Sequence, residues 1–131
     1  MENLRFRAAT IADIDCLLEM KAEYCNREDI CFTTNEARDS LLGLLGSPAQ
    51  SSIWFVQLDG ANVGYFILLF GGGEFTDRTA MVDELYVPVS IWTSDLTHKI
   101  TSFAVQVCRS NGVRVFHERL GNQWYLKTTW L

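Results

Sequence analysis

The stretch MVDELYVP, residues 81–88, contributes most to the prediction of the fold. It is an apolar strand pattern that carries two adjacent carboxylates, Asp83 and Glu84, and ends at a proline. An amphipathic helical pattern begins soon afterwards, near Leu96. A tight turn from a strand into a helix is a common phosphate-binding site, because free backbone N–H groups and the helix dipole converge there. Such turns are usually glycine-rich, whereas the turn at 89–95, VSIWTSD, has no glycine and one acid.

Length and composition are typical of one globular domain, which we expect to span residues 1–131. The net charge of −5 argues against a nucleic-acid surface and is compatible with cationic partners such as amines. No apolar run approaches the roughly 20 residues that span a bilayer, and the N-terminal residues show no signal-peptide pattern, so we expect a cytoplasmic protein without membrane contact. The four cysteines and two histidines form no cluster with metal-ligand spacing, so no metal site is predicted.

The remaining patterns alternate between helix and strand. Thr10 with Asp13 and Thr33 with Glu36 are helix-start signals, and Asp59-Gly60 is a hairpin signal between two strand patterns. The pattern at 63–70 is apolar on both faces, which predicts a central strand covered on both sides. Strands are expected at 4–7, 53–58, 63–70, 80–87 and 113–116, with two helices after the first strand and one after the fourth.

This order, with D-G-x-x-V-G-Y at 59–65 and D-E-L-Y-V at 83–87, resembles the GNAT superfamily of acyl-CoA-dependent N-acyltransferases. The resemblance covers roughly residues 4–116. It implies an α/β (α+β) fold with a single mixed, mostly antiparallel sheet flanked by helices, and a shortened C-terminal part. It also implies transfer of an acetyl group from acetyl-CoA to a primary amine of a small molecule or a protein. The alternative is a catalytically degenerate relative that acts as a binding or interaction protein with weak or no CoA affinity.

The resemblance also implies where the cofactor lies. In the family, the strand that matches 81–87 diverges from its neighbour and leaves main-chain groups free. Those groups bond the pantetheine arm of acetyl-CoA and help to polarise the thioester, a role that falls here on the backbone of Leu85, Tyr86 and Val87.

The following turn departs from the family pattern R/Q-x-x-G-x-G/A, which wraps the CoA pyrophosphate. Trp92 falls near its first position, and Thr93, Ser94, Asp95 and Thr97 occupy the stretch where small residues are expected. Side chains there block close backbone approach, and a positive φ would strain the threonines. At about 6 Å and an effective dielectric of about 20, Asp95 would repel a phosphate charge by roughly 3 kcal/mol. Alternatively, Ser94 or Asp95 caps the helix and satisfies the N–H groups that a phosphate would occupy.

Many relatives use a carboxylate in the preceding strand as general base. Glu84 matches that position better, with Asp83 as the second candidate; adjacent strand residues point to opposite faces, so we expect only one of them to line the cleft. A buried carboxylate in an apolar strand has a raised pKa, which suits a base. The alternative is a structural acid paired with Arg5, Arg7 or Arg78.

The C-terminus is the second departure, because the family continues with a helix and two further strands. One interpretation begins that helix at Gly121-Asn122; the preferred one ends it at 118–121 and places the last strand at 124–131, which alternates and is rich in β-formers. The helix that often supplies a catalytic tyrosine is then shortened or missing, so Tyr125 is a candidate by default. Uncovered apolar surface with Trp124 and Trp130 predicts a homodimer through this segment.

Overall fold

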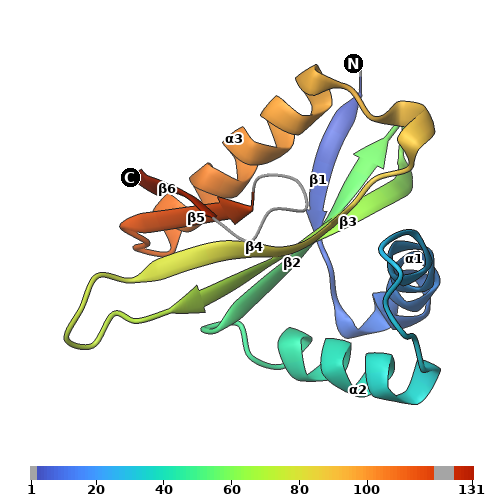
Figure 1. Ribbon diagram of the computed structural model, residues 1–131, viewed down its shortest axis with the longest axis horizontal. Helices are drawn as coiled ribbons and strands as arrows, with labels where there is room; N and C mark the ends of the chain where they lie inside the picture. Colours follow the sequence, from blue (N-terminus) through green and yellow to red (C-terminus); the bar gives the residue numbers. More distant parts are fainter. Residues whose placement is uncertain (1–2, 120–125) are drawn as a thin grey trace.

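The described part of the chain, residues 3–119 and 126–131 of a computed structural model, forms a six-stranded sheet whose strands lie side by side in sequence order (Figure 1). Neighbouring strands are antiparallel except β4 and β5, which are parallel. The predicted mixed, mostly antiparallel sheet is confirmed. The strands are β1 (Leu4–Ala8), β2 (Ser51–Leu58), β3 (Ala61–Gly71), β4 (Thr79–Tyr86), β5 (Val115–Arg119) and β6 (Leu126–Trp130).

The first two helices begin where the sequence signals place them. A short 3-10 helix (Ile11–Asp13) leads into α1 (Ile14–Arg27), and the backbone N–H of Thr10 donates to the Asp13 carboxylate at 2.8 Å. Helix α2 (Thr34–Leu45) begins directly after Thr33, whose hydroxyl donates to Glu36 at 2.9 Å. Helix α3 (Ser94–Ser110) follows β4 after a second 3-10 helix (Val89–Ile91). No helix among the described residues combines the length and apolar character that crossing a membrane requires.

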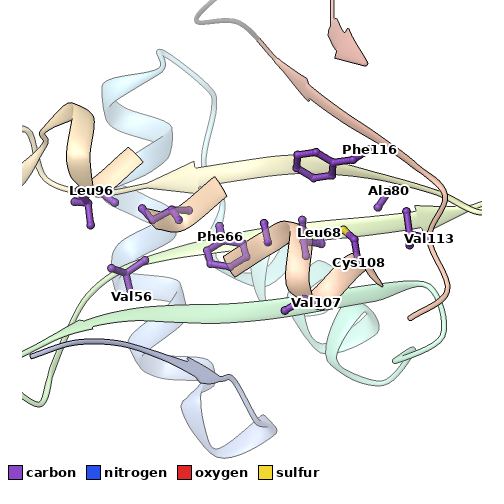
Figure 2. Packing of buried hydrophobic residues seen from close by; sticks show 12 residues of the cluster. Val56, Phe66, Leu68, Ala80, Leu96, Val107, Cys108, Val113 and Phe116 are labelled. Atoms are coloured by element: carbon purple, nitrogen blue, oxygen red, sulfur yellow. The ribbon is translucent and has the colours of Figure 1, made fainter. Parts of the chain in front are cut away.

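The sheet is covered on both faces: α1 and α2 lie on one side, and α3 lies on the other (Figure 1). Alternate residues of β3 therefore enter two hydrophobic clusters. Phe66 and Leu68 pack toward α3 (Figure 2), whereas Tyr65 and Ile67 pack toward α1 and α2. The prediction of a central strand at 63–70 is confirmed, and burial of its apolar side chains on both faces is the main favourable term for this part of the fold.

The β2–β3 hairpin explains much of the D-G-x-x-V-G-Y pattern. Asp59 and Gly60 have φ of 52° and 83°, the left-handed values that two-residue hairpin turns require. Glycine is required at position 64 for a different reason. A Cβ at this position would lie 2.3 Å from the carbonyl oxygen of Tyr86 on β4, so only glycine allows β3 and β4 to approach this closely.

The C-terminal part confirms one expectation and corrects another. Residues 126–130 form the last strand, β6, which pairs with β5 and forms an edge of the sheet. Glu118 and Arg119, however, do not end a helix, because they continue β5 and pair in register with Lys127 and Leu126. The segment 120–125, with Gly121-Asn122, Trp124 and Tyr125, lies outside the described residues. Trp130 is 68% exposed, and the homodimer stays a prediction.

Gly64→Ala tests the close approach of β3 and β4. Because its methyl group would meet backbone rather than a flexible side chain, we expect the free energy of unfolding to fall by about 1–3 kcal/mol. The matched control is Gly43→Ala in α2, where a Cβ meets nothing within 4 Å. Helix propensity predicts a gain of up to about 1 kcal/mol for that variant. Urea unfolding followed by circular dichroism measures both; equal effects of the two substitutions would contradict the packing explanation.

Candidate functional site

Strand β4 is paired with β5 only at its beginning. The pairs are Thr79 with Val115, Ala80 with Phe116 and Met81 with His117, and within the described residues β4 continues to Tyr86 without further pairing to β5. On its other side, β4 pairs with β3 as far as Tyr86. The divergence of β4 from its neighbour that the resemblance implied is therefore present, and no described strand pairs with the β5-facing edge of 82–87.

A cleft of about 1010 Å³ lies along this open edge. Of the residues predicted to bind the cofactor, Leu85, Val87, Ser94 and Thr97 line it. The described lining residues come from the end of α1 and the loop after it, β4, the turn after β4, α3 and β5: Tyr24, Arg27, Glu28, Ile30, Val82, Asp83, Leu85, Val87, Val89, Trp92, Ser94, Thr97, His98, Ile100, Thr101, Ala104 and Glu118. The cleft is thus bounded by α3 on one side and by α1 on the other.

Tyr86 is held on the α1 side of the sheet. Its side chain is almost fully buried, and its hydroxyl donates to the Glu23 carboxylate from α1. Burial raises the pKa of Tyr86, and the hydrogen bond to Glu23 raises it further. The phenol therefore stays protonated and anchors α1 to the end of β4.

Arg27, in the last turn of α1, was not found by sequence reasoning. Its guanidinium donates to the carbonyl of Val87 at 2.7 Å and to that of Leu85 at 3.4 Å, and it lies 5.0 Å from the centre of the Tyr86 ring. The only local signal is a basic residue near a helix C-terminus, which is ordinary. Its contacts join residues about 60 positions apart, so no spacing rule could identify them.

The turn after β4 has an ordinary backbone. Trp92 has a φ of −72° and Thr93 a φ of −138°, and Thr97 is helical, so the strain expected for threonines at positive φ does not arise. The cap of α3 is Thr93, whose hydroxyl accepts the N–H of Leu96 at 3.0 Å, and not Ser94 or Asp95 as expected. The helix begins at Ser94, two residues before Leu96, near which the helical pattern was predicted to begin.

Because α3 begins at Ser94, Asp95 lies in its first turn. Its carboxylate forms an ion pair with Lys99 at 3.3 Å, one helical turn along the exposed surface. A negative side chain in a first turn also stabilises the helix through its dipole. The acid of the turn therefore has a structural explanation.

A second, smaller hollow of about 390 Å³ lies between β4 and the α1–α2 layer. Asp83 and Glu84 both line it, which corrects the expectation that only one of them faces a cleft. The cause is a β-bulge: Ile67 pairs with Glu84 and the next residue, Leu68, pairs with Val82, so Asp83 is the extra residue. A bulge interrupts the alternation of side chains between the faces of a sheet.

Glu84 is held firmly within this pocket. The ammonium of Lys21 donates to one carboxylate oxygen at 2.7 Å, and the hydroxyl of Tyr65 donates to the other at 2.9 Å. Burial raises the pKa of Tyr65 far above its usual value, and the adjacent Glu84 carboxylate raises it further, so this phenol is a permanent donor. The ion-pair partner is Lys21 and none of the predicted arginines.

None of the three arginines proposed as partners of Glu84 forms an ion pair with it in the described residues. Arg7 forms a bidentate pair with Asp13 at 3.0 Å, and Arg78 donates to the carbonyl of Ala49. Arg5 pairs in register with Gln57 on β2, at the far side of β3 from β4. Lys21 was missed because it comes from α1, 63 residues away from Glu84.

Asp83 lines both the cleft and the smaller pocket, as do Tyr24 and Ile30, so the two hollows adjoin at these three residues. Cys25 and Cys31 also line the smaller pocket. Burial raises the pKa of Cys25, which keeps its thiol protonated and makes it a poor nucleophile. No group of three His, Cys, Asp or Glu side chains that could hold a metal ion occurs among residues 3–119 and 126–131.

The chain has the GNAT fold, and its sequence has diverged strongly from those of solved structures with this fold. The most similar structures include an integron cassette protein from the mobile metagenome of Cole Harbour Salt Marsh, with a TM-score of 0.80 and 25% identity over 88% of this chain and 77% of that one. A predicted acetyltransferase from Clostridium acetobutylicum, solved with acetyl-CoA, has a TM-score of 0.75 and 12% identity over 91% and 82%. AAC(6′)-Iy, in complex with the bisubstrate analogue CoA-S-monomethyl-acetylneamine, has a TM-score of 0.74 and 8% identity over 92% and 82%. No family model and no curated protein matches the sequence.

A double-mutant cycle tests the Lys21–Glu84 pair, whose side chains are 15% and 11% exposed. We expect Lys21→Met and Glu84→Gln each to lower the unfolding free energy by about 1–3 kcal/mol, because either change leaves a partner unsatisfied. The coupling energy should exceed about 0.5 kcal/mol. The control pair is Arg38–Asp15, where Asp15 is 84% exposed and the coupling should be smaller. Similar coupling in both pairs would contradict a special role of the buried pair.

Proposed function

We propose that this protein is an acyl-CoA-dependent N-acyltransferase that transfers an acetyl group to a primary amine. The observation that supports this best is the position of Asp83 at the junction of two hollows, one along the open edge of β4 and one lined by carboxylates. A transferase needs such an arrangement, because donor and acceptor must enter separately and meet at the reacting atoms.

The cleft fits an extended donor arm that carries amides. The carbonyls of Leu85 and Val87 on its edge are satisfied by the Arg27 side chain, not by a neighbouring strand. A ligand with amide N–H groups can therefore pair with this edge as another strand would. We assign the backbone of Leu85, Tyr86 and Val87 to the donor arm, and Ser94 and Thr97 on α3 to the opposite wall. The donor supplies the activated acyl group as a thioester.

The smaller pocket suits a cationic acceptor. Its charged lining side chains are Glu36, Asp83 and Glu84 against one ammonium, that of Lys21, so the local field attracts an amine in its protonated form. A protonated amine loses two protons in forming an amide: one before its nitrogen can attack, and a second after the new carbon–nitrogen bond has formed. We propose that Asp83 accepts the first proton, directly or through water, and that the second passes to solvent while the acyl carbon–sulfur bond breaks and the thiolate leaves.

Glu84 is the better match to the family position, but both of its oxygens already accept a hydrogen bond. We therefore propose it as a positioning residue that fixes the pocket wall through Lys21 and Tyr65. A general acid for the thiolate is not assigned, since Tyr125 lies outside the described residues and stays a prediction.

One feature favours the alternative of a binding protein without catalysis. At the start of α3 the hydroxyl of Thr93 already accepts a hydrogen bond from the Leu96 N–H, and a phosphate of the donor would compete for that N–H. This reduces the anion-binding capacity of the turn. The degenerate alternative therefore predicts weak CoA affinity.

Titration with acetyl-CoA separates the two functions. We expect heat of binding in calorimetry and a rise in the melting temperature, because a ligand that binds only the folded state stabilises it by mass action. If about 1 mM acetyl-CoA produced no heat of binding and no rise in melting temperature, the acyltransferase function would be rejected and the alternative of a binding protein would remain.

Asp83→Asn tests the proposed base. We expect kcat/KM for acetyl transfer to a cationic amine to fall by about 10²–10⁴-fold. Glu84→Gln, the matched control, should lose stability and retain more activity. Greater loss of activity in Glu84→Gln than in Asp83→Asn would assign the base to Glu84.

A further inference from the structure

The cleft along β4 is poor in positive charge. Arg27 is the one Lys or Arg among the described residues that line it, alongside His98. Three carboxylates, those of Glu28, Asp83 and Glu118, line the same hollow. CoA carries a pyrophosphate and a ribose phosphate, so a protein that binds it in this cleft must offset several negative charges. Arg27 is the cleft residue whose charge is permanent at all working pH values.

The position of Arg27 is unusual for a surface arginine. It holds the carbonyls of Leu85 and Val87, which are two residues apart and point to the same edge of β4. The carbonyl of the intervening Tyr86 faces β3, where it lies against Gly64. Arg27 thus occupies the edge that faces the cleft, just before the chain enters the turn at Pro88. Its side chain is 32% exposed and can therefore reach the solvent of the cleft.

We infer that Arg27 is the phosphate anchor of the donor and makes phosphate binding and pairing with β4 depend on each other. This inference rests on the proposed function. In the free protein the guanidinium donates to two neutral carbonyls, and its Nε lies 3.7 Å from the Glu28 carboxylate. When a phosphorylated donor enters, the guanidinium exchanges them for phosphate oxygens, which form stronger, charge-assisted and bidentate hydrogen bonds. The exchange releases the Leu85 and Val87 carbonyls for the amide N–H groups of the donor arm.

The same exchange selects against donors without phosphate. An amide arm alone must displace Arg27 from both carbonyls and offers its guanidinium no anion in return beyond the Glu28 carboxylate that it already has. The loss of those hydrogen bonds opposes binding. Arg27 therefore favours a nucleotide-linked arm over the free arm, although the turn after β4 carries no basic residue. Lys99, the nearest lysine on α3, does not replace it, because its ammonium is paired with Asp95.

Calorimetric titration with CoA and with pantetheine, which lacks the phosphates, tests the inference on the intact protein. We expect the wild type to bind CoA at least about tenfold more tightly than pantetheine. Arg27→Met keeps much of the side-chain volume and removes the charge. It should weaken CoA binding by about tenfold or more and leave pantetheine binding unchanged or tighter, so that the preference disappears. Arg27→Lys should restore part of the preference for CoA over pantetheine, because lysine restores the positive charge but lacks the planar guanidinium that binds phosphate with two hydrogen bonds.

Arg38→Met is the matched control, because Arg38 is a half-exposed arginine paired with Asp15 and is not among the cleft residues. It should leave both affinities unchanged, and melting temperatures verify that every variant is folded. Tighter binding of both ligands to Arg27→Met would show that Arg27 only blocks the edge of β4. Unchanged CoA affinity in that variant would show that Arg27 takes no part in binding. Either result would overturn this inference but leave the proposed function standing. Failure of the wild type to bind CoA would reject the proposed function and the inference with it.

Discussion

The unequal pairing of β4 with its two neighbours determines the rest of the structure. β3 pairs with β4 up to Tyr86, helped by a glycine that allows the two backbones to approach closely, whereas β5 pairs with it only from Thr79 to Met81. Main-chain groups that lack a strand partner must find another one if they are removed from water. In this protein the partner is the guanidinium of Arg27, so the open edge is stable in the free protein and is still available for exchange.

The bulge at Asp83 has a second effect on the same strand. A regular strand would separate Asp83 and Glu84 onto opposite faces, one toward α3 and one toward α1. The extra residue lets both Asp83 and Glu84 line the smaller pocket, and Lys21 and Tyr65 hold Glu84 there. Asp83 also lines the larger cleft. A local irregularity thus gives two adjacent residues of the same charge type different surroundings, on which the roles that we propose for them depend.

The sequence predicted most of what depends on local pattern. Capping, turn and burial rules act within a few residues of the chain. They predicted the starts of two helices after Thr10 and Thr33, the hairpin turn at Asp59-Gly60, and the burial of β3 on both faces. It did not predict the bulge, because a bulge depends on the register of two strands and not on the composition of either one. It also missed Lys21 and Arg27, which reach β4 across the sequence from α1. The predicted cap of α3, Ser94 or Asp95, was wrong, because Thr93 is an equally good capping residue and it caps the helix.

The two hydrophobic clusters on opposite faces of the sheet have a consequence for how such a protein can diversify. The wall of the larger cleft formed by α3 is supported by one cluster, and the α1–α2 wall of the smaller pocket is supported by the other. Substitutions that reshape the pocket through α2 can therefore be absorbed on one face without disturbing the packing under α3. The sheet separates the two packing regions, so the shape of the smaller pocket can change over evolutionary time while the wall of the larger cleft is retained.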